Sequence, residues 1–182
     1  MKDNVQDAHI QEAVNAALIE ASMEPHVPFD IKKMAEQLGF AVRNFYRIPA
    51  HIIGIMFLQM DEKMSKMVNA ERLIGLNPQY DLPHQRFAIA HELGHYQMHQ
   101  EQCMHEDNPV FFQTKDDEIG IEQEACKFAA FILMDKNQFS KAYNALKAKQ
   151  CEPIEIIRSL SKQFVAPQSS VVRRIKELRL HG

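Results

Sequence analysis

The chain has 182 residues, a formal net charge of −3, and 46% hydrophobic and 25% charged residues. This length allows one compact domain with a sizeable core, and the composition excludes a disordered or fibrous protein. Three widely spaced cysteines without a CxxC pair argue against a disulfide framework and against a thiolate metal site. We therefore expect three reduced thiols.

The sequence contains no uncharged apolar run near the ~18 residues that a membrane-spanning helix needs. Its first residues, 1–4, lead into a mixed polar helical pattern and not into the apolar segment of a signal peptide. We therefore expect a cytoplasmic protein that makes no membrane contact.

The first part of the chain combines helical and strand patterns. Helical periodicity predicts an amphipathic helix over residues 4–23 and a shorter helix between Asp30 and Gly39. Three strand-like runs follow, separated by polar turns such as residues 61–63. The runs are Phe40–Arg47, Ile52–Met60 and Arg72–Leu76. They predict a small antiparallel sheet.

From Asp81 onward, every regular segment has a helical pattern. The expected helices cover about 82–99, 118–134, 136–148, 153–164 and 168–179. The order of helices, sheet and further helices predicts a mostly helical α+β fold. Residues 101–117 form the one long irregular connection, and because long loops in compact domains are commonly functional, we place it beside the active site.

The helix expected over residues 82–99 contains the string His91-Glu92-Leu93-Gly94-His95, an HExxH motif. Chance would supply roughly 0.04 such matches in a chain of this composition. The two histidines lie about 40° apart on adjacent turns, so both can bind one cation. Glu92 lies close to that cation, where a general base must accept a proton from activated water. The motif predicts a zinc-dependent hydrolase.

Catalytic zinc usually has three protein ligands, so a third residue is needed. No further histidine follows at short spacing, which indicates an acidic residue of the next helix, Glu118, Glu122 or Glu124. Small alanines share the face of Glu122 and would allow close helix packing, so we choose Glu122, with Glu118 as the alternative and Glu124 as a solvated surface acid. We expect His84 and His99 to lie near the site or on the surface without binding the metal.

Two stretches resemble the ImmA/IrrE-type metallopeptidases. Residues 85–95, QRFAIAHELGH, are similar to the family's QRFTIAHELGH, and residues 122–134, EQEACKFAAFILM, are similar to its ExEAnxFAaxLLMP. The resemblance extends to residues 29–42 and to the last two helices. The chain departs from the pattern at Cys126, where the family usually has Asn or Asp, and at Asp135, where it has proline.

The resemblance implies that His91, His95 and Glu122 bind Zn²⁺ and that Glu92 is the general base. It implies a zincin-like metalloendopeptidase that cleaves a helix-turn-helix transcriptional repressor in regulatory proteolysis, in a mobile-element, phage or stress-response setting. We accordingly expect a metallopeptidase domain over residues 1–148 and a helix pair over residues 149–182 that packs on it.

A peptidase also needs a group that stabilises the oxyanion of the tetrahedral intermediate. Six side chains have suitable chemistry, and the sequence does not choose among them: Tyr46, Tyr80, Tyr96, Tyr143, His99 and His105. Residues 101–124 carry eight acidic residues and one lysine, so we expect a basic substrate such as a DNA-binding repressor.

Two other functions compete with proteolysis. Residues 154–164 and 168–178 resemble a helix-turn-helix pair within the basic region 141–182, whose net charge is +6, which would suit a DNA-binding regulator with a structural or vestigial metal site. The last helix begins with weak base-reading residues and carries its basic residues later, so we expect direct DNA binding to be weak or absent. An interaction module with a vestigial site is the third reading, and the intact Glu92 argues against it.

Overall fold

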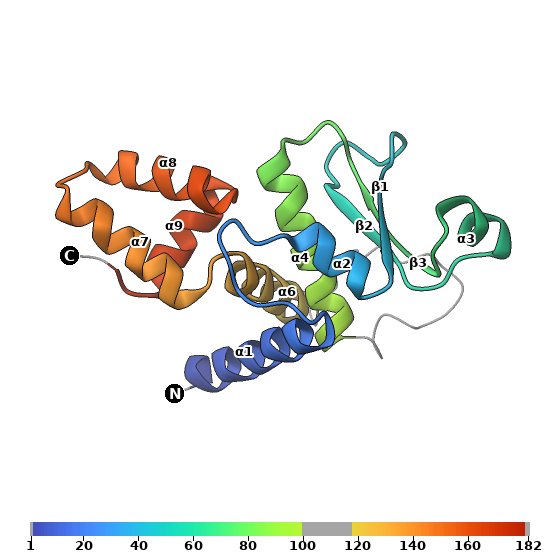
Figure 1. Cartoon of the computed structure of the whole chain (residues 1–182), viewed down its shortest axis with the longest axis horizontal. Coiled ribbons are helices and arrows are strands. Elements are labelled where there is room, and N and C mark those ends of the chain that lie inside the picture. Colours follow the sequence, from blue (N-terminus) through green and yellow to red (C-terminus); the bar gives the residue numbers. More distant parts are fainter. Residues whose placement is uncertain (1, 100–117, 181–182) are drawn as a thin grey trace.

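The structure is a computed structural model, which describes residues 2–99 and 118–180 (Figure 1). In these residues it contains eight helices and three strands, which confirms the mostly helical α+β fold. The elements are α1 (Lys2–Glu20), α2 (Ile31–Gln37), β1 (Phe40–Asn44), β2 (Gly54–Phe57), α3 (Glu62–Val68), β3 (Arg72–Leu76), α4 (Leu82–Met98), α6 (Glu118–Leu133), α7 (Lys136–Ala148), α8 (Pro153–Phe164) and α9 (Gln168–Glu177). None of the described helices is long and apolar enough to cross a bilayer.

Helices α4 and α6 lie in the middle of the molecule (Figure 1). The sheet lies on one side of them, and α7, α8 and α9 gather at the opposite end. The long connection 101–117, which we expected beside the active site, lies outside the described residues together with His105.

The expectation of an antiparallel sheet is wrong for one of the two strand pairings. The strand order is β1-β3-β2, with β2 antiparallel to β3 but β1 parallel to β3. Strand β3 occupies the centre of the sheet and separates β1 from β2, and four of its five residues are accordingly buried. Because β1 and β2 are not neighbours, no hairpin sets their relative direction. Strand β2 is therefore an edge strand, and it faces the site described below.

The polar turn expected at residues 61–63 is also wrong, because it is the start of α3. Asp61 caps this helix by accepting a hydrogen bond from the Met64 backbone nitrogen at 2.7 Å. Val68 and Met64 pack on a small apolar cluster with Leu73 of β3. A helix of two turns thus forms where the sequence shows mainly polar residues.

Aspartates also begin α4 and α7. Asp81 accepts a hydrogen bond from the His84 backbone nitrogen at the start of α4. Asp135 accepts hydrogen bonds from the backbone nitrogens of Asn137 and Gln138 at the start of α7. The aspartate that replaces the usual proline of the resembled pattern is therefore an N-cap.

Close packing of α4 on α6 is possible because small residues lie at the contact. A Cβ atom on Gly94 would lie 3.1 Å from the Ala125 Cα atom and 3.1 Å from the Phe128 Cβ atom. Ala125 and Ala129 are fully buried, as the sequence suggested for the face of α6 that carries Glu122. The glycine of HELGH therefore sets the distance between the two helices.

Two arginines connect the last helices to the rest of the molecule. Arg86 of α4 donates hydrogen bonds to the carbonyl oxygens of Val165, between α8 and α9, and Phe29. Arg174 of α9 is 2% exposed, donates to the Met134 carbonyl oxygen and stacks on the Phe131 ring. The boundary at residues 148 and 149 stays a prediction.

Candidate metal centre

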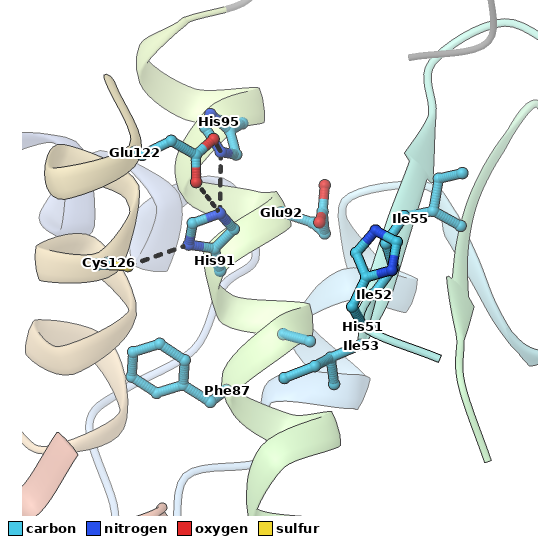
Figure 2. A pocket seen from close by; sticks show the side chains of 12 residues that line it. His51, Ile52, Ile53, Ile55, Phe87, His91, Glu92, His95, Glu122 and Cys126 are labelled. Atoms are coloured by element: carbon cyan, nitrogen blue, oxygen red, sulfur yellow. Dashed lines mark hydrogen bonds and ion pairs between the residues drawn. The ribbon is translucent and has the colours of Figure 1, made fainter. Parts of the chain in front are cut away.

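Three side chains from α4 and α6 converge on one point (Figure 2). The Nε2 atoms of His91 and His95 are 3.0 Å apart. Glu122 of α6 places Oε2 3.2 Å from the His91 Nε2 atom and Oε1 3.1 Å from the His95 Nε2 atom. The chain thus brings together the two histidines of the motif and the acidic residue chosen for the third position.

This donor set fits a metal ion by its geometry. Tetrahedral zinc with bonds of about 2.0–2.1 Å to nitrogen or oxygen has donor atoms roughly 3.3 Å apart, close to the three separations of 3.0 to 3.2 Å. The Glu122 Oε1 atom is buried, and apart from its 3.1 Å contact with the His95 Nε2 atom it has no hydrogen-bond partner within the described part of the chain. A buried carboxylate oxygen of this kind needs a partner, and a cation between the three groups would supply it.

The electrostatics of the cluster favour positive charge at the same point. Burial by itself lowers the pKa of His91, but its contacts with Cys126 and Glu122 outweigh burial and raise that pKa to about 10. Burial acts against ionisation of Glu122, yet the two imidazoles hold its pKa well below the usual range. Burial also lowers the pKa of His95. A proton on His91 or a divalent cation can supply the positive charge.

Glu92 lies on the side of the two histidines opposite Glu122 and points toward β2 (Figure 2). It is 9% exposed, and burial raises its pKa to about 7. Strand β2 comes close to α4 here, because a Cβ atom on Gly54 would lie 3.0 Å from the Ala88 Cβ atom and 3.8 Å from the Glu92 Oε1 atom. Glu92 is thus a buried carboxyl beside the donor set but outside it.

A cavity of about 380 Å³ opens in front of these groups. One wall is formed by α4 and α6, and the opposite wall by β2 and the segment before it. The residues of the opposite wall are His51, Ile52, Ile53, Gly54 and Ile55. This cavity, which we call the cleft, has a volume in the range of ligand-binding pockets and lies directly beside the donor set.

His51 is a polar residue of the cleft that the sequence analysis missed (Figure 2). Its segment is held by the buried Asn77, whose side chain and backbone nitrogen donate to the carbonyl oxygens of Ile52 and Ile53 at 3.0 and 2.8 Å. Tyr80 donates to the Ala50 carbonyl oxygen at 2.8 Å. No motif marks His51, because its place beside the cleft depends on long-range contacts.

The structure locates five of the six oxyanion candidates, and none of these five lines the cleft. Tyr46 is 81% exposed, and Tyr143 is buried near the last helices. Tyr96 accepts a hydrogen bond from Arg72, and Tyr80 donates to Ala50. The remaining described candidate, His99, contacts the outer side of His95.

Glu124, one of the two other acidic candidates for the third ligand, has a different position from Glu122. Glu124 is not the solvated acid we expected, because its side chain is 26% exposed and contacts Gln6 and His99 at 3.0 Å each. These contacts lower its pKa against the opposing effect of partial burial. The Glu118 side chain lies outside the described part of the structure. His84 contacts Asp81 at the surface, away from the cluster.

Cys126 lies behind His91, one turn after Glu122. Its Sγ atom is 3.6 Å from the His91 Nδ1 atom, so it contacts the ring nitrogen that faces away from Glu122. Burial raises the pKa of this thiol, but the hydrogen bond with His91 outweighs burial and lowers it. The thiol therefore contacts His91 on the side away from Glu122, in the position where the resembled pattern has Asn or Asp.

The fold and the site define an α+β protein with an HExxH helix, a His-His-Glu donor set and a buried carboxyl in a cleft, an arrangement that indicates a metallopeptidase. The chain belongs to the IrrE N-terminal-like domain family of M78 peptidases, whose model matches residues 49–176. This membership confirms the resemblance noted in the sequence.

Among solved structures, the chain is similar to a Mycobacterium tuberculosis transcriptional regulator, with a TM-score of 0.58 and 16% sequence identity. The match covers 93% of this chain but 46% of the regulator, so the chain spans less than half of that protein's length. At this identity the likeness concerns the fold alone. No curated protein matches the chain.

Proposed function

We propose that the protein is a zinc-dependent endopeptidase that hydrolyses peptide bonds with water as the nucleophile. The observation that carries the proposal is the convergence of His91, His95 and Glu122 beside the buried Glu92 in one cleft. Two imidazoles and one carboxylate suit zinc, and three protein ligands leave a position open for water. Bound zinc would supply Lewis acidity to the water and to the substrate carbonyl group.

Glu92 is the general base in this proposal. It lines the cleft next to the donor set without being part of it, so its carboxylate is available to the attacking water. It accepts a proton as the water oxygen bonds to the carbonyl carbon, and it returns the proton to the amine nitrogen as the carbon–nitrogen bond breaks. The carboxylate is regenerated in each turnover.

His51 is the group that we assign to the oxyanion. It lies on the wall of the cleft opposite Glu122, and Asn77 and Tyr80 hold the segment that carries it. A ring N–H at this wall donates a hydrogen bond to the carbonyl oxygen as negative charge develops there. The other described candidates lie outside the cleft.

As substrate we propose a helix-turn-helix repressor with a basic DNA-binding domain, the class that the resemblance to ImmA/IrrE-type peptidases implies. The acidic composition of residues 101–124 supports a basic partner. Rising salt should therefore weaken cleavage, mainly through substrate binding, as the Debye length falls toward about 8 Å at physiological ionic strength. A rate that does not change with salt would argue against the electrostatic part of the proposal.

The test is cleavage of candidate repressors by the purified protein, with mass spectrometry of the products. We expect zinc-dependent cleavage that stops on chelation and returns when zinc is added. Glu92→Gln is the control for a contaminating protease, because it leaves all three proposed ligands in place. Cleavage by this variant at the wild-type rate would contradict the proposed mechanism.

A further inference from the structure

A chain of contacts leads from the candidate metal centre to the first helix. His99, at the C-terminal end of α4, is 5% exposed, and its Nδ1 atom lies 3.3 Å from the His95 Nδ1 atom. Its Nε2 atom lies 3.0 Å from the Glu124 Oε2 atom. Glu124 also accepts a hydrogen bond at 3.0 Å from the Gln6 side chain of α1. The contacts therefore link His95, His99 and Glu124 in series.

The carboxylate at the end of this series decides where the protons lie. Glu124 accepts hydrogen bonds, so His99 donates to it through Nε2–H and, as a neutral imidazole, keeps a lone pair on Nδ1. That lone pair accepts a hydrogen bond from the Nδ1–H group of His95. His95 then keeps a lone pair on Nε2, the atom that faces His91 and Glu122. Each step has one donor and one acceptor.

The opposite arrangement would prevent metal binding. A proton on the Nδ1 atom of His99 would make His95 accept at Nδ1 and carry its own proton on Nε2, where a ligand needs a lone pair. The His99 Nε2 atom would then present a lone pair to the Glu124 carboxylate, which is repulsive. Glu124 thus selects the ligand form of His95 through His99.

The position of Glu124 is fixed from a second side. The Gln6 Oε1 atom lies 3.5 Å from the Lys127 ammonium group, so the amide nitrogen of Gln6 faces Glu124. Lys127 also forms an ion pair with Asp7 of α1 at 2.7 Å. Helices α1 and α6 therefore hold the carboxylate toward His99.

We propose that Glu124 and His99 are positioning residues that hold His95 in the tautomer and ring orientation of a zinc ligand. The inference rests on the proposed zinc site. Removing groups that orient a metal-bound histidine typically weakens metal binding by about 10- to 100-fold. Neither residue belongs to the donor set, so the expected loss is smaller than the loss of a ligand.

The experiment measures zinc affinity by competition with a chromophoric chelator for the wild type, Glu124→Ala and His99→Phe. His99→Gln is a rescue variant, because its amide oxygen can still accept the hydrogen bond from His95. Gln97→Ala is the matched control: Gln97 also joins α4 to α1, through a 3.1 Å hydrogen bond to Glu20, but is not in this series. Thermal unfolding with chelator present separates folding from metal binding, and Co²⁺ absorption spectra report the ligand geometry.

We expect zinc dissociation constants about 10- to 100-fold higher for Glu124→Ala and His99→Phe, a smaller change for His99→Gln, altered Co²⁺ spectra, and no such change for Gln97→Ala. Affinities within threefold (about 0.7 kcal/mol) of the wild type for the first two variants would overturn the inference. An equal loss in Gln97→Ala would also overturn it. A wild type that binds no zinc would overturn the proposed function as well. If zinc affinities change as expected in all variants but the wild type cleaves no peptide, the proposed function alone would be contradicted.

Discussion

Gly94 of α4 and Ala125 of α6 are in direct contact, and a Cβ atom on Gly94 would lie 3.1 Å from the Ala125 Cα atom. On α4, Gly94 lies between His91 and His95. On α6, Ala125 lies one turn after Glu122. The distance between α4 and α6 therefore determines how close Glu122 comes to the two histidines.

Gly94→Ala should weaken zinc binding and lower the free energy of unfolding by about 1–3 kcal/mol, because the added methyl group pushes α6 away from α4. Gly120→Ala is the control on α6, since a Cβ atom there meets no atom within 4 Å, and Ala should stabilise the helix by about 0.5–1 kcal/mol. Chemical denaturation and zinc competition measure both effects. Equal zinc affinities in the two variants would show that the helix contact does not set the donor geometry.

Glu92→Gln should retain zinc and lose at least about 100-fold in cleavage rate, because an amide cannot accept the proton from water. Glu20→Gln provides a control at a glutamate that does not line the cleft. Single-turnover cleavage and metal content are measured on the same preparations. Loss of zinc from Glu92→Gln would instead make Glu92 part of the metal site.

Glu122→Ala should reduce zinc affinity more than the about 10- to 100-fold expected for Glu124→Ala, because only Glu122 belongs to the donor set. Competition titrations of both variants and of Glu118→Ala give the order. A large loss in Glu118→Ala alone would move the third ligand by one helical turn. A larger loss in Glu124→Ala than in Glu122→Ala would exchange the two proposed roles.

His51→Ala should lower kcat by about 100- to 1000-fold without loss of zinc, because it removes a donor to the developing oxyanion. Tyr46→Ala is the matched control, since Tyr46 lies in the same connection but is exposed and does not line the cleft. Steady-state kinetics separate kcat from KM. A change in KM alone would make His51 a substrate-binding residue.

Local patterns predicted much of this site from the sequence, and long-range contacts account for what they missed. His91 and His95 share a helical face through their spacing, and the small alanines beside Glu122 indicated the face that meets them. The place of His51 depends on Asn77, and the role of Glu124 on His99 and Gln6. The parallel pairing of β1 with β3 was not predicted for the same reason. The chain runs from β1 to β2 at the opposite edge of the sheet, and β3 then pairs between them, so no hairpin indicates the direction of β1.

The basic residues of α9 do not form one surface, which bears on the DNA-binding alternative. Arg174 is buried, bonded to the Met134 carbonyl oxygen and paired with Glu177, so it is not available to a phosphate group. Arg173 and Lys176 of α9 are exposed, as is Arg179 just beyond its end. A double change at Arg173 and Arg174 would therefore mix a loss of stability with a loss of surface charge.

We expect the zinc-loaded protein to bind mixed-sequence duplexes weakly and with little selectivity, because the last helix and the residues just after it offer three exposed basic side chains, which can neutralise few phosphates. This binding should weaken further as salt rises, since it depends on phosphate contacts. The test variant is Arg173→Ala/Lys176→Ala/Arg179→Ala, which spares Arg174 and should leave thermal unfolding nearly unchanged. It should weaken this binding equally for all sequences. Arg174→Ala alone should instead lower the unfolding temperature, through the lost contacts with Met134 and Phe131. Sequence-selective binding at physiological salt that the triple variant abolishes would favour the DNA-binding regulator over the peptidase.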